Sequence, residues 1–165
     1  MDQHDIDDEL ASAGDLLQSP SAAYLAYTAA DGTPRVSPVG FFWTGEELVV
    51  ATAATAPKVA ALRARPDVAM SINVSDAQTA ARQLAVRGRA EITMVDGVVE
   101  EYLAASRKGM EPEAAAQFEQ ACRDLYDRMA RIAIRPRWAR YYDFGTGRLP
   151  RFLQELAEQS AARHA

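Results

Sequence analysis

The chain has 165 residues, of which 48% are hydrophobic and 25% are charged, with a formal net charge of −5 and an isoelectric point near 5.1. This composition predicts one globular domain with a substantial core. The acidic balance argues against binding to nucleic acid or to an anionic membrane surface, because both require a basic protein surface.

A single cysteine, Cys122, excludes an internal disulfide, and no group of Cys and His residues has the spacing of a metal site. The first ten residues are acidic where a secretory signal would be basic and then apolar, and no stretch approaches membrane-spanning length. We therefore expect a cytoplasmic protein that binds neither a metal nor a membrane.

Hydrophobic periodicity and turn residues predict a mainly β chain with connecting and terminal helices. In chain order we expect a helix at 5–18, strands at 21–29, 34–43 and 47–53, a helix at 57–65, a strand at 67–74, a polar loop at 75–81, a strand at 82–95, helices at 96–107 and 113–129, strands at 130–134 and 138–144 separated at Pro136, and a helix at 151–163. Six to seven antiparallel strands favour a β-barrel, because a barrel buries strand edges that an open sheet exposes. We expect an N-terminal helix over 1–20, the barrel domain over 21–150 and a C-terminal helix over 151–165.

The loop at 53–56 consists of small residues between a strand and a helix, which predicts an anion site. Thr55 is a candidate N-cap, and Pro57 suits the first helical turn. Lys58 in that turn is disfavoured by the helix dipole unless an anion lies between it and the backbone amides. The alternative is an ordinary solvated surface lysine.

The strand at 34–43 contains Pro38, which cannot donate to a ladder, and Gly40, which has no side chain. Together they favour either an open edge that faces a ligand or a barrel corner. Phe41, Phe42 and Trp43 favour an apolar substrate cleft or simple barrel packing.

Two further patterns concern a pair of arginines on a strand and an apolar stripe on a helix. On the strand at 82–95, Arg87 and Arg89 lie either on a solvated outer face or opposite a bound phosphate. In the helix at 113–129, Phe118, Cys122, Leu125 and Met129 form one apolar stripe, which predicts a packing role for the cysteine.

Three segments carry a family resemblance: 33–39 (TPRVSPV), the LVVAT strand that ends at Thr52, and 57–70 (PKVAALRARPDVAM). They resemble the pyridoxamine 5′-phosphate oxidase-like flavin-binding split barrels, which include flavin and deazaflavin oxidoreductases. The resemblance covers about 22–95, with a fainter echo at 139–152.

The resemblance implies a homodimer that holds a flavin, FMN or the deazaflavin coenzyme F-420, in two clefts at the subunit interface. Thr52 and Lys58 match the residues that hold the flavin phosphate, and the backbone of 37–40 matches the strand along the isoalloxazine. We therefore expect cofactor-binding residues at Arg35, Ser37, Pro38, Val39, Thr52, Thr55, Lys58, Arg87 and Tyr141. We expect substrate-binding residues at Phe41, Trp43 and Arg148.

The chain departs from true pyridoxamine phosphate oxidases at Val36, Phe41 and Pro150, which stand where those enzymes carry an arginine, a lysine and a histidine. These departures argue against vitamin B6 oxidation. Because His4 and His164 lie in the termini, no nucleophile–base pair is evident, and catalytic residues are not assigned.

The leading hypothesis is a flavin-dependent oxidoreductase that transfers hydride to or from a small, rather apolar molecule, with FMN as cofactor. The alternatives are a coenzyme F-420-dependent reductase and a non-catalytic cofactor-binding or sensor protein. Coenzyme F-420 has a long anionic tail, which would need a basic groove. Candidates for that groove are Arg35, Arg63, Arg65, Arg87 and Arg89.

Overall fold

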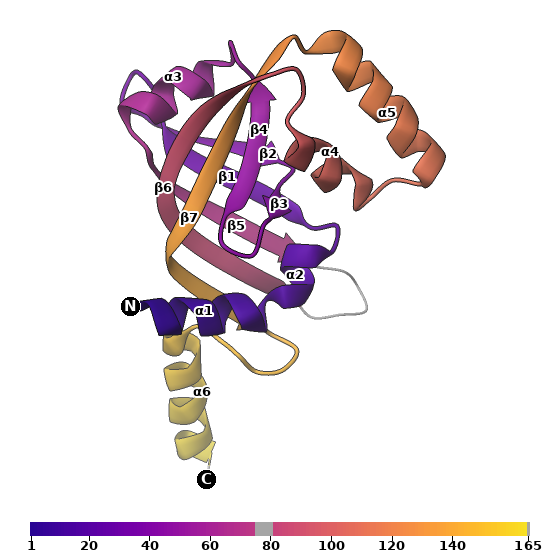
Figure 1. The fold of residues 1–165 in the computed structure, drawn as a ribbon. Helices are drawn as coiled ribbons and strands as arrows, with labels where there is room; N and C mark the ends of the chain where they lie inside the picture. The colour runs from indigo at the N-terminus through magenta and orange to yellow at the C-terminus, as the bar shows by residue number, and fades with distance from the viewer. Residues whose placement is uncertain (75–80, 165) are drawn as a thin grey trace.

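The computed structural model describes residues 1–74 and 81–164. The described chain forms seven strands and six helices (Figure 1). The strands are β1 (Ala22–Thr28), β2 (Pro34–Val39), β3 (Phe42–Trp43), β4 (Leu48–Ala53), β5 (Asp67–Val74), β6 (Arg82–Asp96) and β7 (Arg128–Asp143). The helices are α1 (Gln3–Ser12), α2 (Gly14–Gln18), α3 (Pro57–Ala64), α4 (Glu100–Arg107), α5 (Pro112–Leu125) and α6 (Arg151–His164). The predicted mainly β chain is confirmed; of the polar loop at 75–81, residues 75–80 lie outside the described residues.

The strands form one antiparallel sheet in the order β2-β1-β5-β6-β7-β4-β3, which makes β2 and β3 its two edges. These edges are consecutive in the chain and are joined by Gly40 and Phe41 alone, a link that spans at most about 11 Å. The sheet must therefore curl until its edges approach each other. Because no ladder joins β2 to β3 in the described residues, the barrel is split rather than closed.

Side chains along β6 point alternately into the barrel and out to solvent, and the inward ones line the barrel interior. Leu84 and Val86 point inward and are almost fully buried, whereas Arg87 and Arg89 lie on the exposed outer face. The inward residues of the long strands and the buried faces of α1, α2 and α3 form one apolar cluster, whose most buried side chains include Leu25, Leu48, Leu62, Ile72, Leu84 and Ile132. The predicted core face of β6 is confirmed.

The two strands expected around Pro136 are one continuous strand, β7, so the predicted break is wrong. Pro136 pairs with Gly88 and Trp138 pairs with Arg87, so Arg137 is an extra residue in the ladder. A β-bulge of this kind interrupts the ladder locally, and a proline needs no donor there. The bulge therefore lets β7 pass through Pro136.

The helix expected to extend to Met129 ends at Leu125, so the predicted apolar stripe is only half correct. Cys122 is buried in a second cluster with Val99 and Leu103, which confirms its packing role. Leu125 is 70% exposed, and Met129 reaches the same cluster from β7. The chain leaves the helix early because β7 must begin pairing with β6 at Arg128.

Helices cover the two ends of the barrel. The helix expected at 5–18 is interrupted at Ala13, which separates α1 from α2, and α1 packs against β7. At the other end, α3 contacts β1 and β6. α4 lies along the side of the barrel, where it contacts β3 and β4 (Figure 1). α6 projects from the end where α1 lies (Figure 1). Among the described residues, no helix combines the length and apolar character needed to cross a bilayer.

Candidate functional site

The turn between β4 and α3 leaves a backbone donor free at the start of the helix. The Ala56 N–H donates to the Ala53 carbonyl at 3.0 Å, which closes a tight turn of small residues. α3 then begins at Pro57 without a side-chain cap. The prediction that Thr55 is the N-cap is wrong, because the N-cap is Ala56 and the exposed Thr55 lies one residue earlier. Pro57 has no N–H, and the Val59 N–H donates to the Ala56 carbonyl at 2.9 Å. Since a methyl group accepts no hydrogen bond, the Lys58 N–H in this turn remains available to an external acceptor.

Lys58 lies in this first turn and is half-buried. Burial lowers the pKa of its ammonium from the ordinary value, because the charged form loses hydration. Within residues 1–74 and 81–164 the ammonium has no hydrogen bond or ion pair, and the half-buried Thr52 hydroxyl has none either. These features set Lys58 apart from an ordinary solvated surface lysine. An anion held between the Lys58 ammonium and the N-terminus of α3 would offset both the lost hydration and the unfavourable interaction with the helix dipole.

β2 supplies a free sheet edge. It pairs with β1 on one side and, in the part of the chain that the structure describes, with no strand on the other. Ser37 and Val39 are half-buried, and Pro38 is exposed. The expectation that Pro38 and Gly40 mark an open edge is confirmed. The unpaired backbone groups of such an edge can hydrogen-bond to a ligand.

Arg35 is engaged within the β1–β2 hairpin. Its Nη2 lies 2.9 Å from Asp31 Oδ2, and its Nη1 donates to the Thr33 hydroxyl. Hydrogen bonds from Thr33, with Arg35 adding charge, lower the pKa of Asp31 to about 2. Arg65 joins the hairpin to α3 by donating to the Ala29 carbonyl at 2.9 Å.

Tyr141 and Arg148 belong to a cluster around Glu9 of α1. The Glu9 carboxylate accepts the Tyr141 N–H at 2.7 Å, Arg140 Nη1 at 2.9 Å and Arg148 Nη2 at 2.7 Å. The Arg148 guanidinium lies 5.3 Å from the centre of the Tyr141 ring. Burial, with the nearby Asp143 carboxylate, raises the pKa of the Tyr141 phenol. The cluster joins α1 to the C-terminal part of β7.

The remaining expected residues are dispersed. Arg87 lies on the outer face of the sheet, with its guanidinium 4.2 Å from the centre of the Trp138 ring. Trp43 packs against the main core and borders α1 beside Leu10. The structure therefore brings Thr52, Thr55 and Lys58 into one turn and places 37–39 on the free edge. It does not place Trp43 or Arg148 with them.

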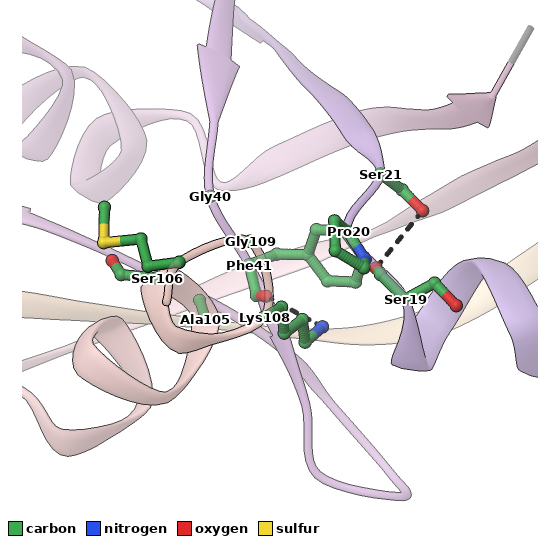
Figure 2. A pocket seen from close by; sticks show the side chains of 10 residues that line it. Ser19, Pro20, Ser21, Gly40, Phe41, Ala105, Ser106, Lys108 and Gly109 are labelled. Atoms are coloured by element: carbon green, nitrogen blue, oxygen red, sulfur yellow. Dashed lines mark hydrogen bonds between the residues drawn. The ribbon is translucent and has the colours of Figure 1, made fainter. Parts of the chain in front are cut away.

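A cavity of ≈ 200 Å³ lies at the split of the barrel, where the β2–β3 link meets the α2–β1 and α4–α5 connections (Figure 2). Its lining comprises Ser19, Pro20, Ser21, Gly40, Phe41, Ala105, Ser106, Lys108, Gly109 and Met110. Phe41, an expected substrate residue, lines this cavity. Lys108 was not identified as a site residue from the sequence, because a lysine at the end of a predicted helix is usually a solvated surface residue.

The chain is thus a split antiparallel β-barrel with a free β2 edge and an uncapped strand–helix turn. The chain belongs to the pyridoxamine 5′-phosphate oxidase family, whose sequence pattern matches residues 11–143. The resemblance identified from the sequence is thus confirmed. No curated protein sequence matches this chain.

Solved structures with the same fold include an F-420 reductase. It is 32% identical, with a TM-score of 0.57, over 76% of this chain and 93% of that chain. A conserved hypothetical protein from Mycobacterium tuberculosis is 21% identical, with a TM-score of 0.59, over 91% of this chain and 89% of that chain. An FAD-binding protein from Mesorhizobium loti is 16% identical, with a TM-score of 0.53, over 78% and 88% of the two chains. The last two show the fold alone.

Proposed function

We propose that this protein is a flavin- or deazaflavin-dependent oxidoreductase that acts on a small, rather apolar molecule. Membership of the family and the likeness to an F-420 reductase support this class of activity. The observation that carries the proposal is the half-buried Lys58 ammonium, which stands at an uncapped helix N-terminus without an anionic partner in the described residues. A cofactor phosphate would supply the missing negative charge.

The residues at the β4–α3 turn fit such a phosphate. The Lys58 ammonium and the Lys58 backbone N–H are donors without acceptors in the described chain, and the Thr52 hydroxyl can add a third contact. Thr55 is exposed in the turn, and we propose that its hydroxyl contacts the outer side of the phosphate. When bound, the flavin-type group supplies hydride transfer. The chain supplies position and charge.

The free β2 edge fits the polar rim of a planar ring. The Ala29 N–H donates to the Thr33 carbonyl, and the β1–β2 register then turns the N–H and C=O groups of Ser37 and Val39 toward β1. The outward groups of the edge are the N–H and C=O of Val36 and the carbonyl of Pro38, which has no N–H. The half-buried side chains of Ser37 and Val39 exclude part of the solvent from this strand. Because the edge has no neighbouring strand, a ligand can use these groups without breaking the sheet.

FMN is the cofactor that we propose first, because it carries a single phosphate and no anionic tail, so that the donors at the turn are sufficient for it. Coenzyme F-420 is the second candidate, since the structure that is 32% identical is an F-420 reductase. Its anionic tail would need further cations near α3. Arg63 and Arg89 are exposed and have no partner in the described ranges, whereas Arg35 and Arg65 are already engaged.

The test is titration of FMN and of coenzyme F-420 into the wild-type protein and the Lys58→Met variant, followed by the absorption and fluorescence of the coenzyme. Loss of a charge-assisted hydrogen bond should weaken binding of the true cofactor roughly ten- to a hundred-fold. The matched control is Arg63→Met on the same helix, which should not change FMN binding. If Lys58→Met binds both coenzymes as tightly as the wild type, the phosphate assignment is wrong.

Salt dependence separates the two coenzymes. Binding through a polyanionic tail should weaken steeply with ionic strength, because exposed charges are screened over about 8 Å at 0.15 M salt. Arg63→Met and Arg89→Met should then weaken binding of F-420 but not of FMN. A high affinity for coenzyme F-420 that changes neither with these two substitutions nor with salt would contradict the proposed tail groove.

We also propose that the chain forms a homodimer across the outer face of the sheet. This face has an apolar hollow of ≈ 300 Å³ bordered by β1, β2, β5, β6 and β7, in which Tyr24 is 42% and Val36 66% exposed. A second copy is the partner that the resemblance implies. Sedimentation should give twice the 18.0 kDa chain mass, and Val36→Lys should give monomers. A wild-type monomer at micromolar concentration would contradict the proposal.

A further inference from the structure

The chain contains only two lysines, Lys58 and Lys108, against 16 arginines. Both lysines are half-buried, and burial lowers the pKa of each. An ammonium differs from a guanidinium in being a compact, strongly hydrated charge that is costly to bury. Lys58 belongs to the proposed cofactor site, but Lys108 lies in the cavity at the barrel split and is not part of that site.

The Lys108 ammonium is held by groups that carry no net charge. Its Nζ donates to the Leu17 carbonyl at 2.9 Å and to the Phe41 carbonyl at 3.3 Å. It also lies 4.4 Å from the centre of the Phe41 ring and 5.9 Å from that of Phe42. Figure 2 shows Lys108 beside Phe41. Carbonyl dipoles and ring faces stabilise a cation but do not neutralise it.

No carboxylate of the described residues forms an ion pair with Lys108, although the chain carries 23 acidic residues. An ammonium has three donors, and two are directed at the carbonyls of Leu17 and Phe41. One donor and one uncompensated positive charge therefore remain. A ligand with a single negative charge would satisfy both.

The rest of the cavity is suited to an apolar group. Pro20, Phe41, Ala105 and Met110 supply carbon surface, and the other lining residues are serines and glycines. No acidic residue and no second cation lines the cavity in the described chain. Its volume of ≈ 200 Å³ equals about seven water molecules at about 30 Å³ each, which is enough for a body of one ring.

Two glycines line the cavity at positions where the backbone conformation does not require glycine. Neither Gly40 nor Gly109 has a positive φ. A Cβ at Gly40 would lie 4.0 Å from Ala105 Cβ, and one at Gly109 would lie 3.8 Å from Pro20 Cβ, which are ordinary contacts. An alanine would therefore fit at either position, and its methyl group would occupy space that the glycine leaves to the cavity.

We infer that this cavity binds a small monocarboxylate with an apolar, ring-sized body, whose carboxylate contacts the Lys108 ammonium. Gly40 lines the cavity and also follows the free β2 edge, so the bound acid lies beside the strand proposed for the flavin-type ring. The role of this acid as substrate rests on the proposed function. Its binding does not.

The experiment titrates benzoate and its neutral analogue benzamide by calorimetry. Because the chain has two lysines, protein labelled with ¹³C at the lysine side chains gives two sets of NMR signals, which the Lys58→Arg variant assigns. Benzoate should bind with a dissociation constant on the order of a millimolar, and benzamide at least about tenfold more weakly. Benzoate should shift the Lys108 signal and raise its apparent pKa, because an anion favours the charged form.

Lys108→Met should weaken benzoate binding roughly ten- to a hundred-fold. Because Lys108 also ties α2 to the β2–β3 link, the loss of its hydrogen bonds can disturb the structure, so Gly109→Ala provides a second perturbation. It keeps the charge, fills the cavity and should also weaken benzoate binding. Lys58→Met is the matched control that removes the other lysine and should leave benzoate binding unchanged.

Three results would overturn the inference: a Lys108 signal that benzoate leaves unmoved, equal binding of benzoate and benzamide, or full benzoate binding by Gly109→Ala. A parallel FMN and F-420 titration separates this inference from the proposed function. Benzoate binding without coenzyme binding would contradict the proposed function alone. Coenzyme binding without benzoate binding would contradict the inference alone.

Discussion

Glu9 should contribute more to stability than any exposed ion pair of this chain. It is the one charged side chain that is buried among the described residues, at 8% exposure. Its carboxylate accepts the buried Tyr141 N–H and two guanidinium groups, from Arg140 and Arg148, and so holds α1 against β7. Glu9→Ala removes all three contacts at once.

The cost of Glu9→Ala follows from the exposure of its partners. The Tyr141 N–H is left buried without an acceptor, which costs about 1–3 kcal/mol. The Arg140 and Arg148 side chains are 48% and 39% exposed, so they can regain water, and each lost pair costs no more than about 1 kcal/mol. The free energy of unfolding should therefore fall by about 2–4 kcal/mol. Glu9→Gln, which keeps an acceptor for the N–H, should cost about half as much.

Urea unfolding with a constant m-value measures this loss, and the melting temperature should fall by roughly 6–12 °C for a chain of this size. The matched control is Glu155→Ala on α6, which removes a 2.7 Å pair with the 90% exposed Arg151. That substitution should cost less than about 0.5 kcal/mol. If Glu9→Ala loses less than about 1 kcal/mol, or no more than the control, the role assigned to the buried carboxylate is refuted.

Three further outcomes are expected. Gly88→Ala should cost roughly 1–3 kcal/mol in urea unfolding, because a Cβ would lie 2.6 Å from the Arg135 carbonyl oxygen and backbone cannot move aside cheaply; wild-type stability would contradict this contact. Cys122 should resist iodoacetamide until the protein unfolds, because burial shields the thiol and raises its pKa; rapid labelling of folded protein would show that the α5 cluster opens. FMN binding should be strong at pH 7 and should weaken as the pH rises through the Lys58 pKa, which lies below the ordinary 10.5, because only the ammonium pairs with phosphate. Lys58→Arg should abolish this pH dependence. A wild-type affinity for FMN that stays constant up to pH 10.5 would contradict the assignment.

Features that depend on neighbouring residues alone could be predicted from the sequence. The alternation on β6, the start of α3 at Pro57 and the turn at Gly32, with a φ of 82°, all follow from local periodicity and backbone preferences. The segment from Thr52 to Lys58, at the junction of strand and helix, spans only seven residues. The candidate anion site in this segment could therefore be recognised from the sequence alone.

Features that depend on a distant partner could not be predicted in this way. Pro136 looks like a strand break until the bulge opposite Gly88 removes the need for its N–H. The end of α5 at Leu125 is set by the pairing of β7 with β6, not by a stop signal in the helix itself. Local patterns cannot reveal either outcome, because the deciding hydrogen bonds come from another strand.

The same distinction applies to charged side chains. The sequence determined that Lys58 stands in the first turn of a helix, and hence that an anion would suit it. Only the tertiary structure placed Lys108 against the Leu17 carbonyl, 91 residues away, and Glu9 against the Tyr141 N–H, 132 residues away. Burial changes the energy of a charge far more than its sequence neighbours do. Which charges are buried, and beside which partners, is decided when the curled sheet brings its distant strands and helices together.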